Sequence, residues 1–117
     1  MRPTVLIVDD HEAFRDSASA LLEAEGFSVV GQAADGREAL AKAERLRPHV
    51  VLLDVQLPDL DGFTVAERLS AMPDAPRVVL ISSRESAAYG ARLSGAHALG
   101  FITKRELSAR TLTALVG

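Results

Sequence analysis

The chain has 117 residues, a length that fits one domain with its own hydrophobic core and is short for two. Its net charge of −3 and its 13 scattered basic residues argue against direct binding of nucleic acid, and the lack of cysteine excludes disulfides and thiolate metal sites. Apolar runs of at most about five residues exclude a membrane span, so we expect one soluble domain, residues 1–117, in the cytoplasm.

Apolar runs and stretches of helical period alternate along the first half of the chain. Residues 4–8 predict a strand, and the Ala/Leu/Glu-rich residues 11–25 predict a helix that ends at Gly26. Residues 27–33 predict a second strand. Asp35 is the expected N-cap of a second helix, which runs to about residue 46.

The second half of the chain repeats this order three times. Strands are predicted at residues 50–54, 77–82 and 98–103, and helices at residues 63–71, 86–93 and 106–116. We expect the Ala-rich, glycine-flanked residues 87–95, after the fourth strand, to be weakly anchored, and they are a candidate moving part. Strands that are buried on both faces and joined by helices predict a three-layer α/β fold, with five parallel strands flanked by five helices.

Polar residues follow the apolar runs at the point where each strand ends. In open α/β sheets, ligands bind outside the carboxyl ends of the strands, so we expect these side chains to share one pocket. They are Asp9 and Asp10 after the first strand, Asp54 at the end of the third, Ser82 and Ser83 at the fourth, and Thr103 and Lys104 at the fifth.

Three carboxylates in one pocket repel one another and require a cation. Because the donors are oxygens, Mg2+ is the favoured ion, completed by water and phosphate oxygens. An aspartate carboxylate can accept a phosphoryl group covalently. We therefore predict Asp54 as the acceptor, Asp9 and Asp10 as metal ligands, Lys104 as the cation that neutralises the phosphoryl group, and a serine hydroxyl as a hydrogen-bond donor.

Simpler interpretations of several polar residues remain open at this stage. Asp9 and Asp10 could cap the helix that follows them, and Lys104 could be a solvated charge. We interpret His11 as a solvated residue at a helix start. Asp59 and Asp61 are most simply turn-formers and helix caps.

Four segments carry a resemblance that spans essentially the whole chain. They are LIVDDHEAFR, VVLLDVQLPDLDG, VVLISS and GFITK. In these segments the chain resembles the receiver domains of bacterial two-component response regulators, most closely those that precede a helix-turn-helix DNA-binding domain. The resemblance implies a flavodoxin-like sheet with strand order 2-1-3-4-5.

The resemblance also implies the roles of individual residues. Asp54 would be the phosphoacceptor, Ser82 in preference to Ser83 the switch hydroxyl, and Phe101 the aromatic switch residue. The backbone carbonyl of Gln56 would be a further Mg2+ ligand, and Lys104 would bind the phosphoryl group.

The implied function is a signalling switch and not an enzyme: it would catalyse only its own phosphorylation and dephosphorylation. A sensor histidine kinase or a phosphotransfer protein would donate the phosphoryl group. Phosphorylation-linked homodimers are a family expectation. Output would be transcriptional, with DNA bound only through an effector domain outside these residues.

The sequence departs from the family pattern at two places, and three other functions remain possible alternatives. Arg105 stands where many receivers have a proline that forms a cis peptide bond, and we expect the last helix to be truncated. The rivals are a degenerate receiver that serves as an interaction module, a phosphohydrolase with an aspartate nucleophile, and a flavodoxin-type cofactor binder. Haloacid dehalogenase-like hydrolases need an acid two residues after the nucleophile, where this chain has Gln56. A flavodoxin-type binder needs a hydroxyl-rich loop where this chain has Asp9 and Asp10.

Overall fold

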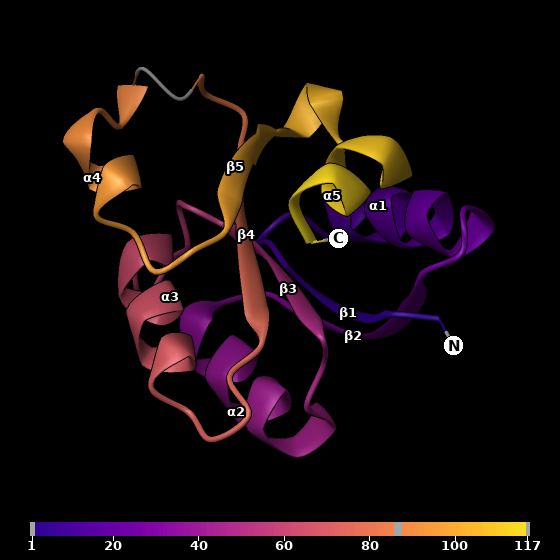
Figure 1. Ribbon diagram of the computed structural model, residues 1–117, viewed down its shortest axis with the longest axis horizontal. Helices are drawn as coiled ribbons and strands as arrows, with labels where there is room; N and C mark the ends of the chain where they lie inside the picture. Colours follow the sequence, from indigo (N-terminus) through magenta and orange to yellow (C-terminus); the bar gives the residue numbers. More distant parts are fainter. Residues whose placement is uncertain (1, 86–87, 117) are drawn as a thin grey trace.

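The computed structural model describes residues 2–85 and 88–116, and these form one five-stranded parallel sheet (Figure 1). The strand order is β2-β1-β3-β4-β5, as the resemblance implies. The strands are β1 (Thr4–Val8), β2 (Ser28–Ala33), β3 (Val50–Asp54), β4 (Arg77–Ser82) and β5 (Gly100–Thr103). The central strand β3 pairs with β1 on one side and β4 on the other, and all five of its residues are buried.

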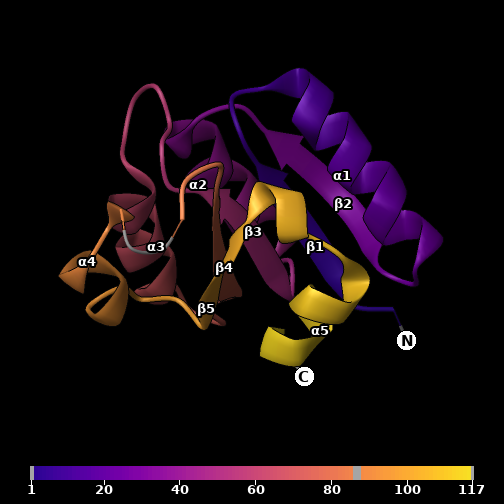
Figure 2. The ribbon, with the colours of Figure 1, turned by 90° about the horizontal axis from the view of Figure 1, so that it is seen from above.

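Helices cover both faces of the sheet, which confirms the three-layer architecture. The helices are α1 (Glu12–Ala24), α2 (Gly36–Leu46), α3 (Gly62–Ser70), α4 (Ala91–Ser94) and α5 (Ala109–Val116), with a 3-10 helix η2 (Lys104–Glu106) before α5. Helices α1 and α5 lie on one face, and α2, α3 and α4 lie on the other (Figure 2). No helix among the described residues is long and apolar enough to cross a bilayer.

The sheet separates two hydrophobic cores because successive strand residues point to opposite faces. In β1, Val5 and Ile7 pack with Leu22 of α1 and Leu112 of α5. The intervening β1 residues Leu6 and Val8 pack in the second core, with residues of α2 and α3. The apolar runs of the sequence therefore form strands with two buried faces, and their polar ends lie together at one edge.

Side-chain caps fix the starts of α2 and α3. The Asp35 carboxylate accepts a hydrogen bond from the Glu38 backbone N–H at 2.8 Å, and Glu38 accepts one in return from the Ala34 N–H. The Asp61 carboxylate accepts from the Thr64 N–H at 2.8 Å. The caps predicted at Asp35 and Asp61 are confirmed.

The fourth helix differs from its prediction. Residues 86–93 were expected to be helical, but Ser86 and Ala87 lie outside the described residues and α4 begins only at Ala91. Gly90 has φ 54° and ψ −131°, a conformation that no helix contains and that glycine adopts readily. The prediction of a helix through position 90 was wrong because the backbone conformation at Gly90 interrupts the helix despite the helix propensity of the alanines around it.

The last helix also starts later than predicted. Residues 106–116 were expected to be helical, but a 3-10 turn ends at Glu106 and α5 begins at Ala109. Ser108 and Thr111 exchange hydrogen bonds, Ser108 N–H to Thr111 Oγ1 at 2.9 Å and Thr111 N–H to Ser108 Oγ at 3.1 Å, which caps the helix at this point. The Lys104–Arg105 peptide bond, the point of departure from the family pattern, is trans.

Candidate functional site

The carboxyl ends of three strands bring two buried carboxylates and one ammonium group into contact. Asp9 follows β1 and is fully buried, Asp54 ends β3 and is 4% exposed, and Lys104 follows β5. Lys104 Nζ lies 2.6 Å from Asp9 Oδ2 and 3.4 Å from Asp54 Oδ2. The sequence predicted that these residues converge, and they do.

Asp9 is held in place by its neighbours and keeps one oxygen without a directional partner. Its Oδ1 accepts a hydrogen bond from the His11 backbone N–H at 2.8 Å. Its main-chain oxygen accepts one from Arg15 Nη1 at 2.7 Å. Among the described residues, Oδ2 has the Lys104 ion pair but no directional hydrogen bond. A buried carboxylate oxygen in this state is suited to a cation.

Asp10 and His11 lie at the exposed mouth of the cluster. The Asp10 side chain is 38% exposed, and its Oδ1 lies 3.0 Å from His11 Nδ1. Helix α1 starts with no side-chain cap, so the alternative in which Asp9 and Asp10 serve as caps is wrong. Potential ligand atoms of four residues lie within 4.8 Å of one another, namely those of Asp9, Asp10, His11 and Asp54.

Asp54 has an unusual acidity for an aspartate. Burial, helped by the charge of Asp9, raises the pKa of Asp54 from 3.8 to about 6. The Gln56 backbone N–H, which donates to Asp54 Oδ1 at 3.1 Å, and the Lys104 charge act in the opposite direction without cancelling this rise. The pocket therefore holds too little positive charge for its carboxylates, and a bound cation would relieve this.

Lys104 is stabilised in its charged form. Burial acts to lower its pKa, but the carboxylates of Asp9 and Asp54 outweigh burial and raise it. The Lys104 ammonium group also lies 4.7 Å from the centre of the Phe14 ring of α1. Lys104 is therefore not a solvated charge. The contact between Lys104 and Phe14 was not predicted. Phe14 lies in the first turn of α1, close to Asp10 in the sequence, and this place is consistent with the contact.

Ser82 and Ser83 differ sharply in their surroundings. Ser82 is 2% exposed, and Ser83 is exposed. Ser82 Oγ lies 2.5 Å from the hydroxyl of Tyr89, whose ring centre is 5.9 Å from that of Phe101. Tyr89 was not identified from the sequence as a site residue, and its position seven residues after Ser82 gives no local signal for this contact.

The loop after β3 fits closely around the end of the strand that carries Asp54. The Gly62 N–H donates to the Val55 carbonyl at 2.7 Å, and Gln56 forms an antiparallel bridge with Asp61. A Cβ atom on Gly62 would lie 2.4 Å from the carbonyl oxygen of Asp54. Glycine is thus required here by a close backbone approach.

Asp59 in the same loop is a structural residue. Its carboxylate accepts hydrogen bonds from the Gly36 N–H at 2.8 Å and the Arg37 N–H at 3.0 Å, at the start of α2. The bond from Gly36 is the largest cause of the lowered pKa of Asp59. The prediction that Asp59 and Asp61 are turn-formers and caps is confirmed.

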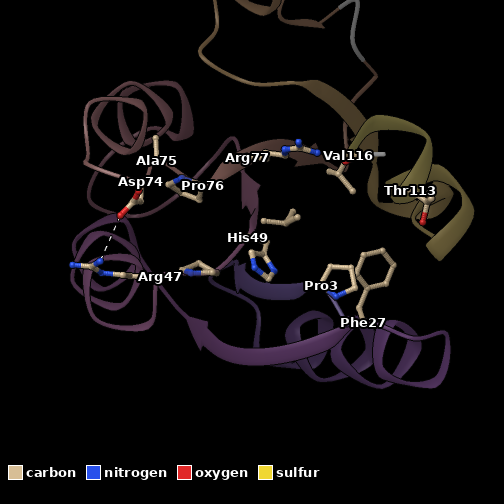
Figure 3. Close-up of a pocket in the computed structure, with 12 residues that line it drawn as sticks. Pro3, Phe27, Arg47, His49, Asp74, Ala75, Pro76, Arg77, Thr113 and Val116 are labelled. Carbon is tan, nitrogen blue, oxygen red and sulfur yellow. Dashed lines mark hydrogen bonds and ion pairs between the residues drawn. The ribbon is translucent and has the colours of Figure 1, made fainter. Parts of the chain in front are cut away.

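A cavity of about 590 Å³ lies at the opposite end of the sheet, where the strands begin (Figure 3). Its lining includes Pro3, Phe27, His49, Arg77 and Val116. It contains neither the buried carboxylates nor Lys104. The cavity and the acidic cluster thus lie at opposite ends of the strands.

Comparisons with known proteins relate the whole fold to one family. The model of the response regulator receiver domain matches residues 5–116. BvgA of Bordetella pertussis, described as a putative positive transcription regulator of virulence factors, is 35% identical to this chain over 102 residues. These cover 87% of this chain and 49% of BvgA.

Two further similar proteins differ in what accompanies the matched part. A protein-glutamate methylesterase/protein-glutamine glutaminase of Anaeromyxobacter dehalogenans is 45% identical over 103 residues, 87% of this chain and 29% of that protein. The structure of the chemotaxis response regulator CheY4 of Vibrio cholerae has a TM-score of 0.86 at 28% identity and covers 98% of this chain and 99% of its own. The chain thus spans half or less of the two longer relatives and nearly all of the third.

Proposed function

Because this chain belongs to the family of response regulator receiver domains, we propose that Asp54 accepts a phosphoryl group and that the modification switches the conformation of the domain. One observation carries the proposal. Asp54 and Asp9 are buried at the ends of adjacent strands with Lys104 between them, an arrangement that costs folding energy and is suited to binding a charged ligand.

Asp9, Asp10, Asp54 and the backbone carbonyl of Gln56 would hold Mg2+. The donor set supports this assignment, because these donors are all oxygens and Asp9 Oδ2 lacks a directional partner among the described residues. When bound, Mg2+ would neutralise phosphoryl oxygens and the surplus carboxylate charge. The raised pKa of Asp54 would then fall, so that its carboxylate is ionised and nucleophilic at neutral pH.

The transfer itself follows from the residues around Asp54. An oxygen of the Asp54 carboxylate attacks phosphorus, the bond from phosphorus to the donor breaks, and the donor leaves with the electron pair. Lys104 neutralises one phosphoryl oxygen and the Ser82 hydroxyl donates to another. Water later attacks phosphorus, which releases inorganic phosphate and restores Asp54. The domain would act in this way only on itself.

Donor and output are part of the same proposal. The donor would be a sensor histidine kinase or a phosphotransfer protein. The similarity to BvgA supports transcriptional output through an effector domain outside residues 1–117, with DNA bound there. The similarity to a methylesterase shows that related receivers accompany other activities. A cytoplasmic location and a phosphorylation-linked homodimer belong to the proposal as well.

Intact mass spectrometry after incubation with Mg2+ and acetyl phosphate tests the acceptor. We expect one phosphoryl adduct on the native chain, none without Mg2+, and none on Asp54→Ala. Asp59→Asn is the matched control, because Asp59 is an exposed carboxylate in the adjoining loop and should leave the adduct unchanged.

Two results would overturn the proposal. An adduct that persists in Asp54→Ala would place the phosphoryl group elsewhere. If the native chain forms no adduct with acetyl phosphate or a histidine-phosphorylated donor, and also binds no Mg2+, the chain is a degenerate receiver that serves as an interaction module.

A further inference from the structure

The hydroxyl group that should bind the phosphoryl group is already engaged in this structure. Ser82 Oγ accepts a hydrogen bond from the Arg84 backbone N–H at 3.0 Å and lies 2.5 Å from the Tyr89 hydroxyl. Among residues 2–85 and 88–116, Ser82 makes no hydrogen bond to Asp54 or to Lys104. The Ser82 hydroxyl is therefore engaged by partners outside the acidic cluster.

The hydrogen-bonding capacity of a serine hydroxyl makes this engagement a constraint. A hydroxyl group has one hydrogen and two lone pairs, and the Arg84 N–H uses one of the lone pairs. The Tyr89 contact uses either the hydrogen or the second lone pair. In both cases the Cβ–Oγ bond of Ser82 points toward Tyr89, and rotation toward Asp54 requires that this hydrogen bond be broken.

Tyr89 is itself held by aromatic contacts on both sides. Its ring centre lies 5.9 Å from that of Phe63, in α3, and 5.9 Å from that of Phe101, in β5. The Arg92 guanidinium lies 4.2 Å above the centre of the Phe63 ring, on the same side of the sheet. Tyr89 thus connects the Ser82 hydroxyl to the segment that leads into α4.

We propose that Tyr89 is a positioning residue that holds the Ser82 hydroxyl away from Asp54, so that phosphoryl binding must break the Ser82–Tyr89 hydrogen bond and free the α4 segment to move. This rests on the proposed function of Asp54. The cost of breaking the bond lowers the affinity of the site for the phosphoryl group. The same cost couples the chemistry at β3 to the position of the segment around Tyr89.

The surroundings of Tyr89 allow it to respond. None of the four residues of α4 is buried, and the helix lacks a side-chain cap. Tyr89 is only half-buried, so water can become the partner of its hydroxyl once the hydrogen bond to Ser82 is broken. Movement of the Tyr89 ring would also uncover Phe101, which deepens the role of that residue as a switch.

The first test is a double-mutant cycle read by the affinity for beryllofluoride, a phosphoryl mimic, in the presence of Mg2+. Tyr89→Phe retains the ring and removes the hydroxyl, and it should bind beryllofluoride about five-fold more tightly than the native chain, the factor expected for one hydrogen bond. In a Ser82→Ala background, Tyr89→Phe should have no effect. Ser83→Ala, which alters the neighbouring exposed serine, is the control and should bind as the native chain does.

The second test uses the chain's own fluorescence. The sequence has one tyrosine and no tryptophan, so emission excited at wavelengths that phenylalanine does not absorb comes from Tyr89. Beryllofluoride with Mg2+ should change this emission in the native chain, because the Tyr89 hydroxyl loses its partner. In Asp54→Ala the emission should stay constant.

The outcomes separate the positioning role from the function on which it rests. If the native chain is phosphorylated on Asp54 but Tyr89→Phe binds beryllofluoride no more tightly, the positioning role is wrong and the acceptor role stands. An equal gain in both Ser82 backgrounds would also overturn it, because the effect would not act through Ser82. If the native chain takes up neither phosphoryl group nor beryllofluoride, both proposals fall.

Discussion

Helices α3 and α4 lie next to each other on one face of the sheet and are anchored very differently (Figures 1 and 2). Helix α3 buries Gly62, Val65, Ala66 and Leu69 and has an aspartate cap. Helix α4 buries no residue and starts at a glycine without a side-chain cap. This face of the sheet is therefore divided into a part that is fixed to β3 and a part that is held only by half-buried contacts, such as that of Leu93, and can move at lower cost.

The largest expected effect comes from adding one methyl group at the start of α3. In Gly62→Ala the new Cβ would meet the backbone of Asp54 and Val55, and we expect a loss of about 3 kcal/mol in the free energy of unfolding together with impaired phosphorylation. Alanine is the better helix former, so helix propensity cannot cause this loss. Urea unfolding followed by circular dichroism measures it.

Gly90→Ala is the matched variant at the start of α4. No atom lies within 4 Å of its added Cβ, so only the backbone conformation of φ 54° and ψ −131°, which favours glycine, opposes it, at a cost of about 2 kcal/mol. Equal losses for the two variants would break the distinction between a fixed and a movable helix.

An intermediate effect is expected from the charge at the end of β3, beneath α3. The pKa of Asp54 is about 6 in the folded chain and 3.8 when unfolded, so the folded state binds more protons between these values and stability falls as pH rises through them. Asp54→Asn should therefore stabilise the Mg2+-free protein by about 2 kcal/mol at pH 7. Thermal unfolding at a series of pH values measures the gain.

Its pH dependence distinguishes this gain from a packing effect. The gain of Asp54→Asn should vanish as the pH falls well below 3.8, because the carboxyl group of Asp54 is then neutral in both the folded and the unfolded state. Ser82→Ala, at the buried end of the next strand but uncharged, should change stability equally at all these pH values. A constant gain for Asp54→Asn would contradict the electrostatic explanation.

The smallest expected effect concerns the exposed link between the two helices. Arg92 of α4 pairs with Asp61 at 3.2 Å and lies over the Phe63 ring. Arg92→Gln should cost less than about 1 kcal/mol of global stability but should speed hydrogen exchange in α4 and leave α3 unchanged. Arg92→Lys keeps the charge but loses the flat guanidinium. Its hydrogen-exchange rate in α4 should lie between those of the native chain and Arg92→Gln. Faster exchange in both helices would mean that they move as one unit.

Much of the fold and part of the site were accessible from the sequence. The strands Thr4–Val8, Val50–Asp54 and Arg77–Ser82 have the bounds predicted for them, because each is a continuous apolar run that ends at a polar residue. The convergence of Asp9, Asp54 and Lys104 followed from parallel strand topology. The strand order itself depended on the family resemblance.

What the sequence did not reveal depends on tertiary packing. The Ser82–Tyr89 hydrogen bond depends on where the segment before α4 lies, and no local pattern encodes that position. The contact of Lys104 with Phe14 joins elements 90 positions apart, a separation that periodicity cannot detect. The helix predicted across Gly90 failed because one backbone conformation outweighed the propensity of its neighbours.

The division of the interior into two cores by a single sheet has a consequence for how such a domain can diversify. Residues of α1 and α5 pack in one core, while Tyr89 and Phe101 pack against the other. Substitutions on the α1 and α5 side can therefore accumulate without disturbing the packing around Tyr89. The packing on the two faces can then evolve, or be engineered, separately, and the two faces meet at the acidic edge of the sheet.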